Sequence, residues 1–141
     1  YKNLTWFGKG PHETYGDRKE SGIKKKHSSS VEAQYVPYIM PQEHGNLTEI
    51  SWLKISNGTK NVKFSVQSEI QASVSNYLDE DLTKALRISE LRPTEYCWVY
   101  LDAMQRGLGG ASCGPDTLDR YQVGPGTYKL EYQITSGDAS T

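Results

Sequence analysis

The sequence predicts an all-β protein built as an antiparallel sandwich. Its 141 residues include 13 glycines and 6 prolines, which separate short runs of alternating, β-branched or aromatic residues. Only one segment has the composition of a helix. Many short strands between turn residues, with a single small helix, are typical of antiparallel sandwiches. The length suits one domain, which we expect to span residues 1–141.

The first expected strand is Leu4–Phe7. The next two, Thr48–Ile55 and Lys60–Ser68, should pair as a hairpin. Between them lies Asn57-Gly58, a dipeptide that readily takes the positive φ values of a type I′ turn. The second arm carries apolar residues on one face: Val62, Phe64 and Val66.

Two signals predict the remaining strands: the first is a high content of β-branched and aromatic residues, and the second is the alternation of apolar and polar residues. Ile70–Val74 and Tyr96–Leu101 show the first signal. Tyr128–Ile134 shows the second, because apolar and polar residues alternate strictly along it, which predicts a strand with one buried face. The turn Gly124-Pro125-Gly126 precedes it, and Tyr121–Val123 should be the strand that enters this turn.

The one predicted helix is Asp79–Leu86. Asp79 can cap its N-terminus, and Glu80 and Asp81 are favoured at the positive end of the helix dipole. Helix capping therefore explains this acidic triplet better than a metal site or an acid–base pair does.

Composition excludes several classes of function. The net charge of −1 gives no basic surface for nucleic acid, and no apolar stretch approaches the roughly 18 residues of a membrane span. The one basic run, Lys24-Lys25-Lys26-His27, is expected to be a solvated strand end or loop. The three histidines and two cysteines do not have the spacing of metal ligands.

The segment Ala33–Asn46 is the most informative irregular stretch. Its prolines, Pro37 and Pro41, fix φ and push the preceding residues toward extended geometry, so we expect a stiff path. Two interpretations are open. Tyr35 and Tyr38 either meet a ligand or another domain, or they pack as a strap over the core.

Two glycine-containing segments accompany this strap. In residues 6–18, Gly10 and Pro11 impose a tight turn, and a Glu–Arg or Asp–Arg pair is expected to latch it. Three charged residues can supply that pair: Glu13, Asp17 and Arg18. Residues 107–116 contain four glycines and a proline, so their backbone can approach a ligand or a neighbouring domain closely, or simply form a long connection.

These segments together resemble the C-terminal domain, also called the fifth or small-chain region, of large multidomain β-galactosidases of glycoside hydrolase family two. The resemblance covers nearly the whole chain. Each motif alone is weakly specific, but their common order is a strong signal. In order the motifs are Trp6-Phe7-Gly8-x-Gly10-Pro11-His12-Glu13, Tyr15-x-Asp17-Arg18, Gln34-Tyr35-Val36-Pro37-Tyr38, Pro41-Gln42-Glu43-x-Gly45-Asn46, Trp52, Asp79-Glu80-Asp81-Leu82, Leu101-Asp102, Gly107-Leu108-Gly109-Gly110 and Ser112-Cys113-Gly114-Pro115-Asp116.

The resemblance implies a galactose mutarotase-like supersandwich, of which this chain is about the C-terminal half. It implies that the catalytic carboxylates of a retaining enzyme lie in a separate (β/α)8 barrel, so that this fragment alone is inactive. The partner is then the rest of the β-galactosidase chain, and the galactoside substrate binds to that whole enzyme. The whole enzyme can also be a homo-oligomer. No cofactor is implied in this chain, and any magnesium or sodium ion belongs to the barrel.

The resemblance also assigns candidate site residues. It places the edge of the sugar pocket at Gly110, Ser112, Cys113, Gly114 and Asp116. The structural motif comprises Trp6, Gly10, Pro11, His12, Glu13, Asp17, Arg18, Tyr35, Pro37, Tyr38 and Glu43. Cys113 lies about where many relatives carry a tryptophan that can stack on a sugar, and Gly16 stands where many carry a proline. Because a thiol offers little area, we expect weaker stacking in this variant.

One alternative comes from a different functional class. The chain could be a stand-alone carbohydrate-binding β-sandwich, in which case a flat face with exposed tyrosine or tryptophan rings is expected.

Overall fold

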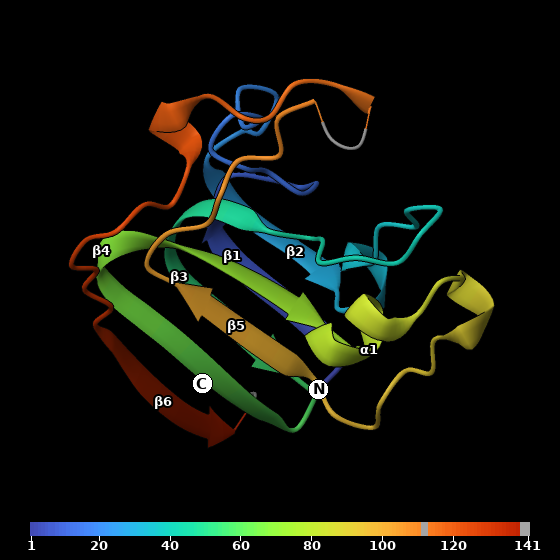
Figure 1. The fold of residues 1–141 in the computed structure, drawn as a ribbon. Helices are drawn as coiled ribbons and strands as arrows, with labels where there is room; N and C mark the ends of the chain where they lie inside the picture. Colours follow the sequence, from blue (N-terminus) through green and yellow to red (C-terminus); the bar gives the residue numbers. More distant parts are fainter. Residues whose placement is uncertain (111–112, 139–141) are drawn as a thin grey trace.

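A computed structural model of the protein describes residues 1–110 and 113–138, and its architecture is all-β and antiparallel (Figure 1). Six strands form one sheet in the order β2-β1-β3-β4-β5, and β6 pairs with β4. The strands are β1 Asn3–Gly8, β2 Lys25–Ser30, β3 Leu47–Ser56, β4 Lys60–Ser75, β5 Trp98–Asp102 and β6 Tyr132–Asp138. This arrangement confirms the predicted fold class and is consistent with a β-sandwich.

The long strand β4 organises the sheet. Most of its length runs beside β3, while its first half pairs with β6 and its second half with β5. The predicted strands Lys60–Ser68 and Ile70–Val74 are therefore one continuous strand. The register of β3 against β4 shifts on both sides of Ile50, where Glu49 has a φ of 56°. Such an irregularity bends the sheet.

The hairpin between β3 and β4 is confirmed, but its turn differs from the prediction. Among the described residues of the turn, only Gly58 has a positive φ, at 92°, whereas a type I′ turn requires positive φ at two successive positions. The side-chain oxygen of Asn57 instead accepts hydrogen bonds from the backbone N–H groups of Thr59 and Lys60. Asn57 thus closes the turn through its side chain.

The main core is formed by β1, β3 and the second half of β4, with Val31 added. Trp6, Leu4 and Leu53 are fully buried there. The complete buried set is Leu4, Trp6, Val31, Leu47, Ile50, Leu53, Ile55, Ile70, Ala72 and Val74. At about 25 cal/mol per Å² of apolar area, this cluster is the main stabilising element of the domain.

The structure contains a strand that the sequence did not predict. Strand β2 pairs with β1 at one edge of the sheet and includes most of the basic run. Only His27 is buried in it, where its ring stacks on Trp6 with centroids 5.1 Å apart. A polar edge strand lacks the apolar alternation from which strands are predicted, and lysines protect such edges from pairing with other chains.

Two C-terminal predictions are wrong. Residues 121–123 are not a strand, because the 3-10 helix η4 (Asp119–Tyr121) uses this backbone and the Tyr121 carbonyl accepts a hydrogen bond from Gly107. Strand β6 begins at Tyr132, four residues later than predicted, and its apolar face is not buried. The side chains of Tyr132 and Ile134 are 49% and 55% exposed, since no described segment covers them.

Helix α1 (Asp79–Lys84) confirms the predicted helix, although Leu78 and not Asp79 is its N-cap residue. The Leu78 side chain makes no capping hydrogen bond, and the Asp79 N–H donates instead to the Tyr100 hydroxyl at 3.2 Å. The helix packs through Leu82 in a second, smaller apolar cluster with Ala85 and Leu91. The rings of Tyr35 and Tyr77 lie against this cluster, beside the 3-10 helices η1 (Glu32–Gln34) and η2 (Ile88–Glu90).

Candidate functional site

The loops that carry the predicted motifs gather at one end of the sheet (Figure 1). The blue loop after β1 and the orange segment after β5 lie side by side there, and the teal strap runs from this end toward α1. Residues distant in sequence therefore meet in one region, and three carboxylates make the connections.

Glu13 joins the turn after β1 to the strap. Its side chain is 6% exposed and accepts three hydrogen bonds. The donors are the Arg18 guanidinium at 2.6 Å, the Tyr38 hydroxyl at 2.5 Å and the Gly45 backbone N–H at 2.9 Å. The expected acid–arginine latch is therefore the Glu13–Arg18 pair. Because a buried carboxylate is stable only when its oxygens are satisfied, Glu13 fixes both segments at once.

The local sequence shapes the turn that delivers Glu13. The Trp6 indole N–H donates to the Lys9 carbonyl at 3.0 Å, which folds the chain back over the ring. A Cβ atom at Gly10 would lie 2.7 Å from Cζ2 of Trp6, so only glycine fits there. The following peptide bond, Gly10–Pro11, is cis.

Tyr15 links the same turn to Glu43 of the strap. Tyr15 is 1% exposed, and its hydroxyl donates to the two carboxylate oxygens of Glu43 at 3.3 and 3.2 Å. Burial raises the pKa of Glu43 from 4.5 to about 7, and repulsion from Asp79, Glu13 and Asp102 adds to the increase. Burial likewise raises the pKa of Tyr15, so its hydroxyl stays neutral and donates.

Asp17 performs a different task from the one that sequence reasoning considered. It does not pair with Arg18 but holds the glycine-rich segment, 91 to 100 residues further along the chain. Its carboxylate accepts hydrogen bonds from the backbone N–H of Leu108 at 3.0 Å, from that of Gly109 at 2.7 Å and from the Thr117 hydroxyl at 2.9 Å. Burial opposes ionisation, yet these bonds lower the pKa of Asp17.

Glycine is required where this segment meets Asp17. A Cβ atom at Gly107 would lie 2.6 Å from Cγ of Asp17, and Gly109 has a φ of 63°. Both positions therefore exclude larger residues on steric grounds.

The tip of the glycine-rich segment holds the predicted edge of the sugar pocket. The Gly110 N–H donates to the Pro115 carbonyl at 2.8 Å, and a Cβ atom at Gly110 would lie 2.7 Å from Cα of Gly114, so the base of the tip is narrow. Asp116 accepts two hydrogen bonds from Arg106 at 2.5 and 2.6 Å. Cys113 is exposed, whereas Ser112 lies outside the described residues.

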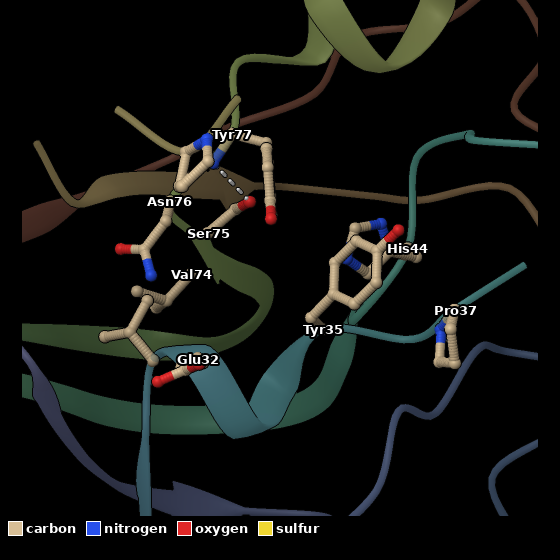
Figure 2. A pocket seen from close by; sticks show the side chains of 10 residues that line it. Glu32, Tyr35, Pro37, His44, Val74, Ser75, Asn76 and Tyr77 are labelled. Carbon is tan, nitrogen blue, oxygen red and sulfur yellow. Dashed lines mark hydrogen bonds between the residues drawn. The ribbon is translucent and has the colours of Figure 1, made fainter. Parts of the chain in front are cut away.

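The strap also borders a pocket of about 520 Å³ that the sequence did not indicate (Figure 2). Tyr35 and Tyr77 stand on one side, and Asn76 and Glu32 on the other. The centroids of the two tyrosine rings are 5.3 Å apart, and the His44 ring meets Tyr35 edge-on at 4.9 Å. Pro37, another predicted residue, lies at the end of this pocket near His44 (Figure 2).

The other predicted residues have structural surroundings. His12 is exposed and shares a hydrogen bond of 3.0 Å with the Ser21 hydroxyl. Pro11 and His12 border a shallower hollow next to Glu13 and Arg18. Over residues 1–110 and 113–138, no three histidine, cysteine or acidic side chains are grouped so that they could hold a metal ion. The helices in the same part of the chain are too short or too polar to cross a membrane.

The site residues that sequence reasoning missed are Thr117, Glu32, Asn76 and Tyr77. Thr117 is the partner of Asp17, but nothing in the local sequence connects residues 100 positions apart. Asn76 and Tyr77 follow β4 directly, and a polar and an aromatic residue at a strand end are too common to indicate a pocket. The two prolines and the tyrosines of the strap were the only local signal.

The fold and the site define an antiparallel β-domain whose end loops are anchored by carboxylates, one of them, Glu13, buried. The chain belongs to the family described as β-galactosidase small chain, which matches residues 1–135.

Individual relatives agree with this membership. A β-galactosidase of Priestia megaterium is 47% identical over 111 residues, which cover 78% of this chain and 11% of that protein. Those of Psychromonas ingrahamii and Arthrobacter sp. strain B7 are 30% and 29% identical over 92% of the chain. The chain spans only 12% and 13% of their lengths.

The raised pKa of Glu43 predicts a pH-dependent stability. Its folded pKa of about 7 lies above the ordinary value of 4.5, so the folded state holds the proton more tightly. The stabilisation is fully present below the unfolded pKa and is lost as pH rises through 7. Glu43→Gln stays neutral and still accepts from Tyr15. We expect its advantage over the wild type to grow from near zero at pH 4 to about 2–3 kcal/mol at pH 8.

Urea denaturation at both pH values measures this difference. Glu49→Gln is the matched control with the opposite sign, because a hydrogen bond from Lys19 lowers the pKa of Glu49. That variant should lose stability at pH 8. An advantage of Glu43→Gln that is equal at both pH values would show that the Glu43 carboxyl does not titrate as described.

Proposed function

We propose that this chain is the non-catalytic C-terminal part of a longer retaining β-galactosidase of glycoside hydrolase family two. In that enzyme it packs on the catalytic barrel, and its glycine-rich segment shapes the edge of the galactoside pocket. The observation that carries the proposal is the attachment of this segment to Asp17 through Leu108, Gly109 and Thr117. Because its residues are small and its base is held by a carboxylate, the backbone of this segment can approach a sugar closely.

The uncovered apolar face of the sheet supports packing on another part of the enzyme. Tyr132 and Ile134 pair with Val66 and Phe64 of β4, and these side chains share one face with Val62. Tyr132 and Ile134 are about half exposed, and the three β4 residues are only partly buried. Contiguous apolar surface of this kind marks a site of association.

The hydrogen bonds of Glu13 and Glu43 support the placing of the catalytic carboxylates elsewhere in the enzyme. Retaining glycosidases need two carboxyl groups about 5–5.5 Å apart, one as nucleophile and one as acid–base. Glu13 is occupied by Arg18 and Tyr38, and Glu43 is occupied by Tyr15. Neither of these two acids borders the 520 Å³ pocket, where the lining residue with a carboxylate is Glu32.

A chimera tests the proposal. The segment of the Priestia megaterium β-galactosidase that matches this chain is replaced by residues 1–141, and hydrolysis of a chromogenic β-galactoside is measured beside a deletion of the same segment. We expect the chimera to be active, whereas the deletion and the 141-residue chain alone are inactive. Turnover by the pure 141-residue chain, or full activity of the deletion, would contradict the proposal.

The uncovered face predicts that the isolated chain self-associates. Replacing Tyr132 and Ile134 together by lysine should weaken the association roughly 10- to 100-fold, because apolar burial of each side chain is worth about 1.5–3 kcal/mol at most. Light scattering over a concentration series gives the association constant.

The matched control for this test lies on the same strand. Gln133 and Thr135 alternate with the apolar residues and so point to the opposite face of β6. Replacing both by lysine adds the same charge, and we expect the association to persist. A wild-type chain that is monomeric at all concentrations would remove this support for packing.

The glycine-rich tip predicts an effect on substrate affinity. In the chimera, Cys113→Trp should lower KM about 2- to 10-fold with little change in kcat, since an aromatic ring adds stacking area at an exposed position. Cys113→Ala serves as the control and should leave KM within about twofold. An unchanged KM for Cys113→Trp would show that this position does not face the sugar.

A further inference from the structure

The pocket between the strap and the end of β4 has polar groups that the described chain does not use. The side chains of Asn76 and Glu32 make no hydrogen bond with any described residue, and neither do the hydroxyls of Tyr35 and Tyr77. All four residues border the hollow, and Figure 2 shows the two tyrosines on one side and the Asn76 amide and Glu32 carboxylate on the other. Together they offer both donors and acceptors.

The aromatic side of this pocket is held in place by packing. Tyr35 and Tyr77 rest against the cluster of Leu82, Ala85 and Leu91, and the edge of His44 supports Tyr35. The backbone on both sides is fixed as well. The Tyr77 N–H donates to the Ser75 hydroxyl at 2.9 Å, and the Asn76 carbonyl accepts from Thr94 at 2.7 Å. Rings fixed in this way form a preorganised wall.

The charge of the lining narrows the ligand class. No lysine or arginine borders the pocket, and Glu32 carries a negative charge, so anionic ligands are disfavoured. An organic cation would use the rings and Glu32 but would leave the Asn76 amide N–H groups without an acceptor. A neutral ring compound with an apolar face and several hydroxyls can use the rings, the amide and the carboxylate together. The volume of the pocket, about 520 Å³, lies within the range of roughly 300–1,000 Å³ typical of small-molecule sites.

We propose that this pocket is a binding site for a neutral pyranose sugar. The sugar places its C–H face against Tyr35 and Tyr77, and its hydroxyls bond to the Asn76 amide and the Glu32 carboxylate. This inference goes beyond the proposed function, because it assigns sugar binding to the 141-residue chain itself, at a place other than the glycine-rich segment.

Saturation-transfer NMR with D-galactose tests the site and works whether or not the chain self-associates. We expect transfer from the protein to the galactose ring protons at millimolar concentrations, and much weaker transfer to galactitol. Galactitol has the corresponding hydroxyls but no ring that can lie flat on tyrosine. Tetramethylammonium chloride is the probe for the cation alternative.

Two sets of variants locate the binding. Asn76→Ala combined with Tyr77→Phe removes two hydrogen-bonding groups without touching the core, and should weaken galactose binding at least 3- to 10-fold. The matched control, Asn3→Ala with Tyr96→Phe, makes the same changes at exposed positions elsewhere and should bind like the wild type. Glu32 is exposed, so Glu32→Gln should leave the chain folded, and the loss of its charged acceptor should weaken galactose binding about 3- to 10-fold.

Three results would overturn the proposal. The first is the absence of transfer to galactose at tens of millimolar. The second is equal transfer to galactose in the wild type and in the Asn76→Ala, Tyr77→Phe variant. The third is a chain that binds tetramethylammonium and not galactose, with the cation binding abolished by Glu32→Gln. The measurement concerns binding to the 141-residue chain and not hydrolysis, so its failure leaves the result of the chimera unaffected.

Discussion

Replacing Glu13 with alanine is expected to lower the free energy of unfolding by about 3–5 kcal/mol, because several hydrogen-bond donors lose their acceptor. The change removes the acceptor of Arg18, Tyr38 and the Gly45 N–H together. The Gly45 N–H is buried and would lose its partner, which costs more than the loss of an exposed hydrogen bond. Because the strap and the turn are joined here, both should loosen.

Urea denaturation of the 141-residue chain measures this loss. Glu20→Ala is the matched control, since Glu20 is exposed in the same loop, and we expect it to change stability by less than about 0.5 kcal/mol. Glu13→Gln should fall between the two, because it retains the shape of the side chain but not its charge. A loss below about 1 kcal/mol for Glu13→Ala would mean that the strap does not depend on this carboxylate.

Replacing Asp17 with alanine is expected to release the glycine-rich segment. The substitution removes the acceptor of the Leu108 and Gly109 N–H groups and of the Thr117 hydroxyl, at a cost of about 2–4 kcal/mol. The loss should be local, because the sheet core does not involve this segment. Hydrogen exchange at Leu108 and Gly109 should accelerate about 30- to 1,000-fold, which is the same free energy expressed as a rate ratio.

Two comparisons sharpen the Asp17 experiment. Asp119→Ala removes an exposed carboxylate near the same segment and should leave the exchange of both amides unchanged. In the chimera, Asp17→Ala should raise KM for galactosides, as the proposed pocket edge loses its support. Unchanged exchange at Leu108 and Gly109 would show that the segment is held by other contacts.

Local pattern identified most of the strands. In β1, β3, β4 and β5, apolar residues alternate or β-branched and aromatic residues accumulate, and burial in the sheet rewards that pattern directly. Strand β2 escaped because it is polar and lies at an edge. The alternation from Tyr128 to Ile134 predicted a buried face that does not exist in this chain, since burial depends on what covers a face and not only on the face itself.

The order of motifs identified the β-galactosidase small chain family, and the turn residues Gly10 and Pro11 indicated where the chain reverses. The sequence by itself thus determined the all-β class, most of the strands, the short helix and the family. Only the tertiary structure decided that Asp17 holds residues about a hundred positions away, that Glu43 is buried near other acids, and that Asn76 faces Tyr35 across a pocket. The physical reason is that strands form from short-range alternation of apolar residues, whereas hydrogen bonds between loops depend on where a completed sheet places their ends.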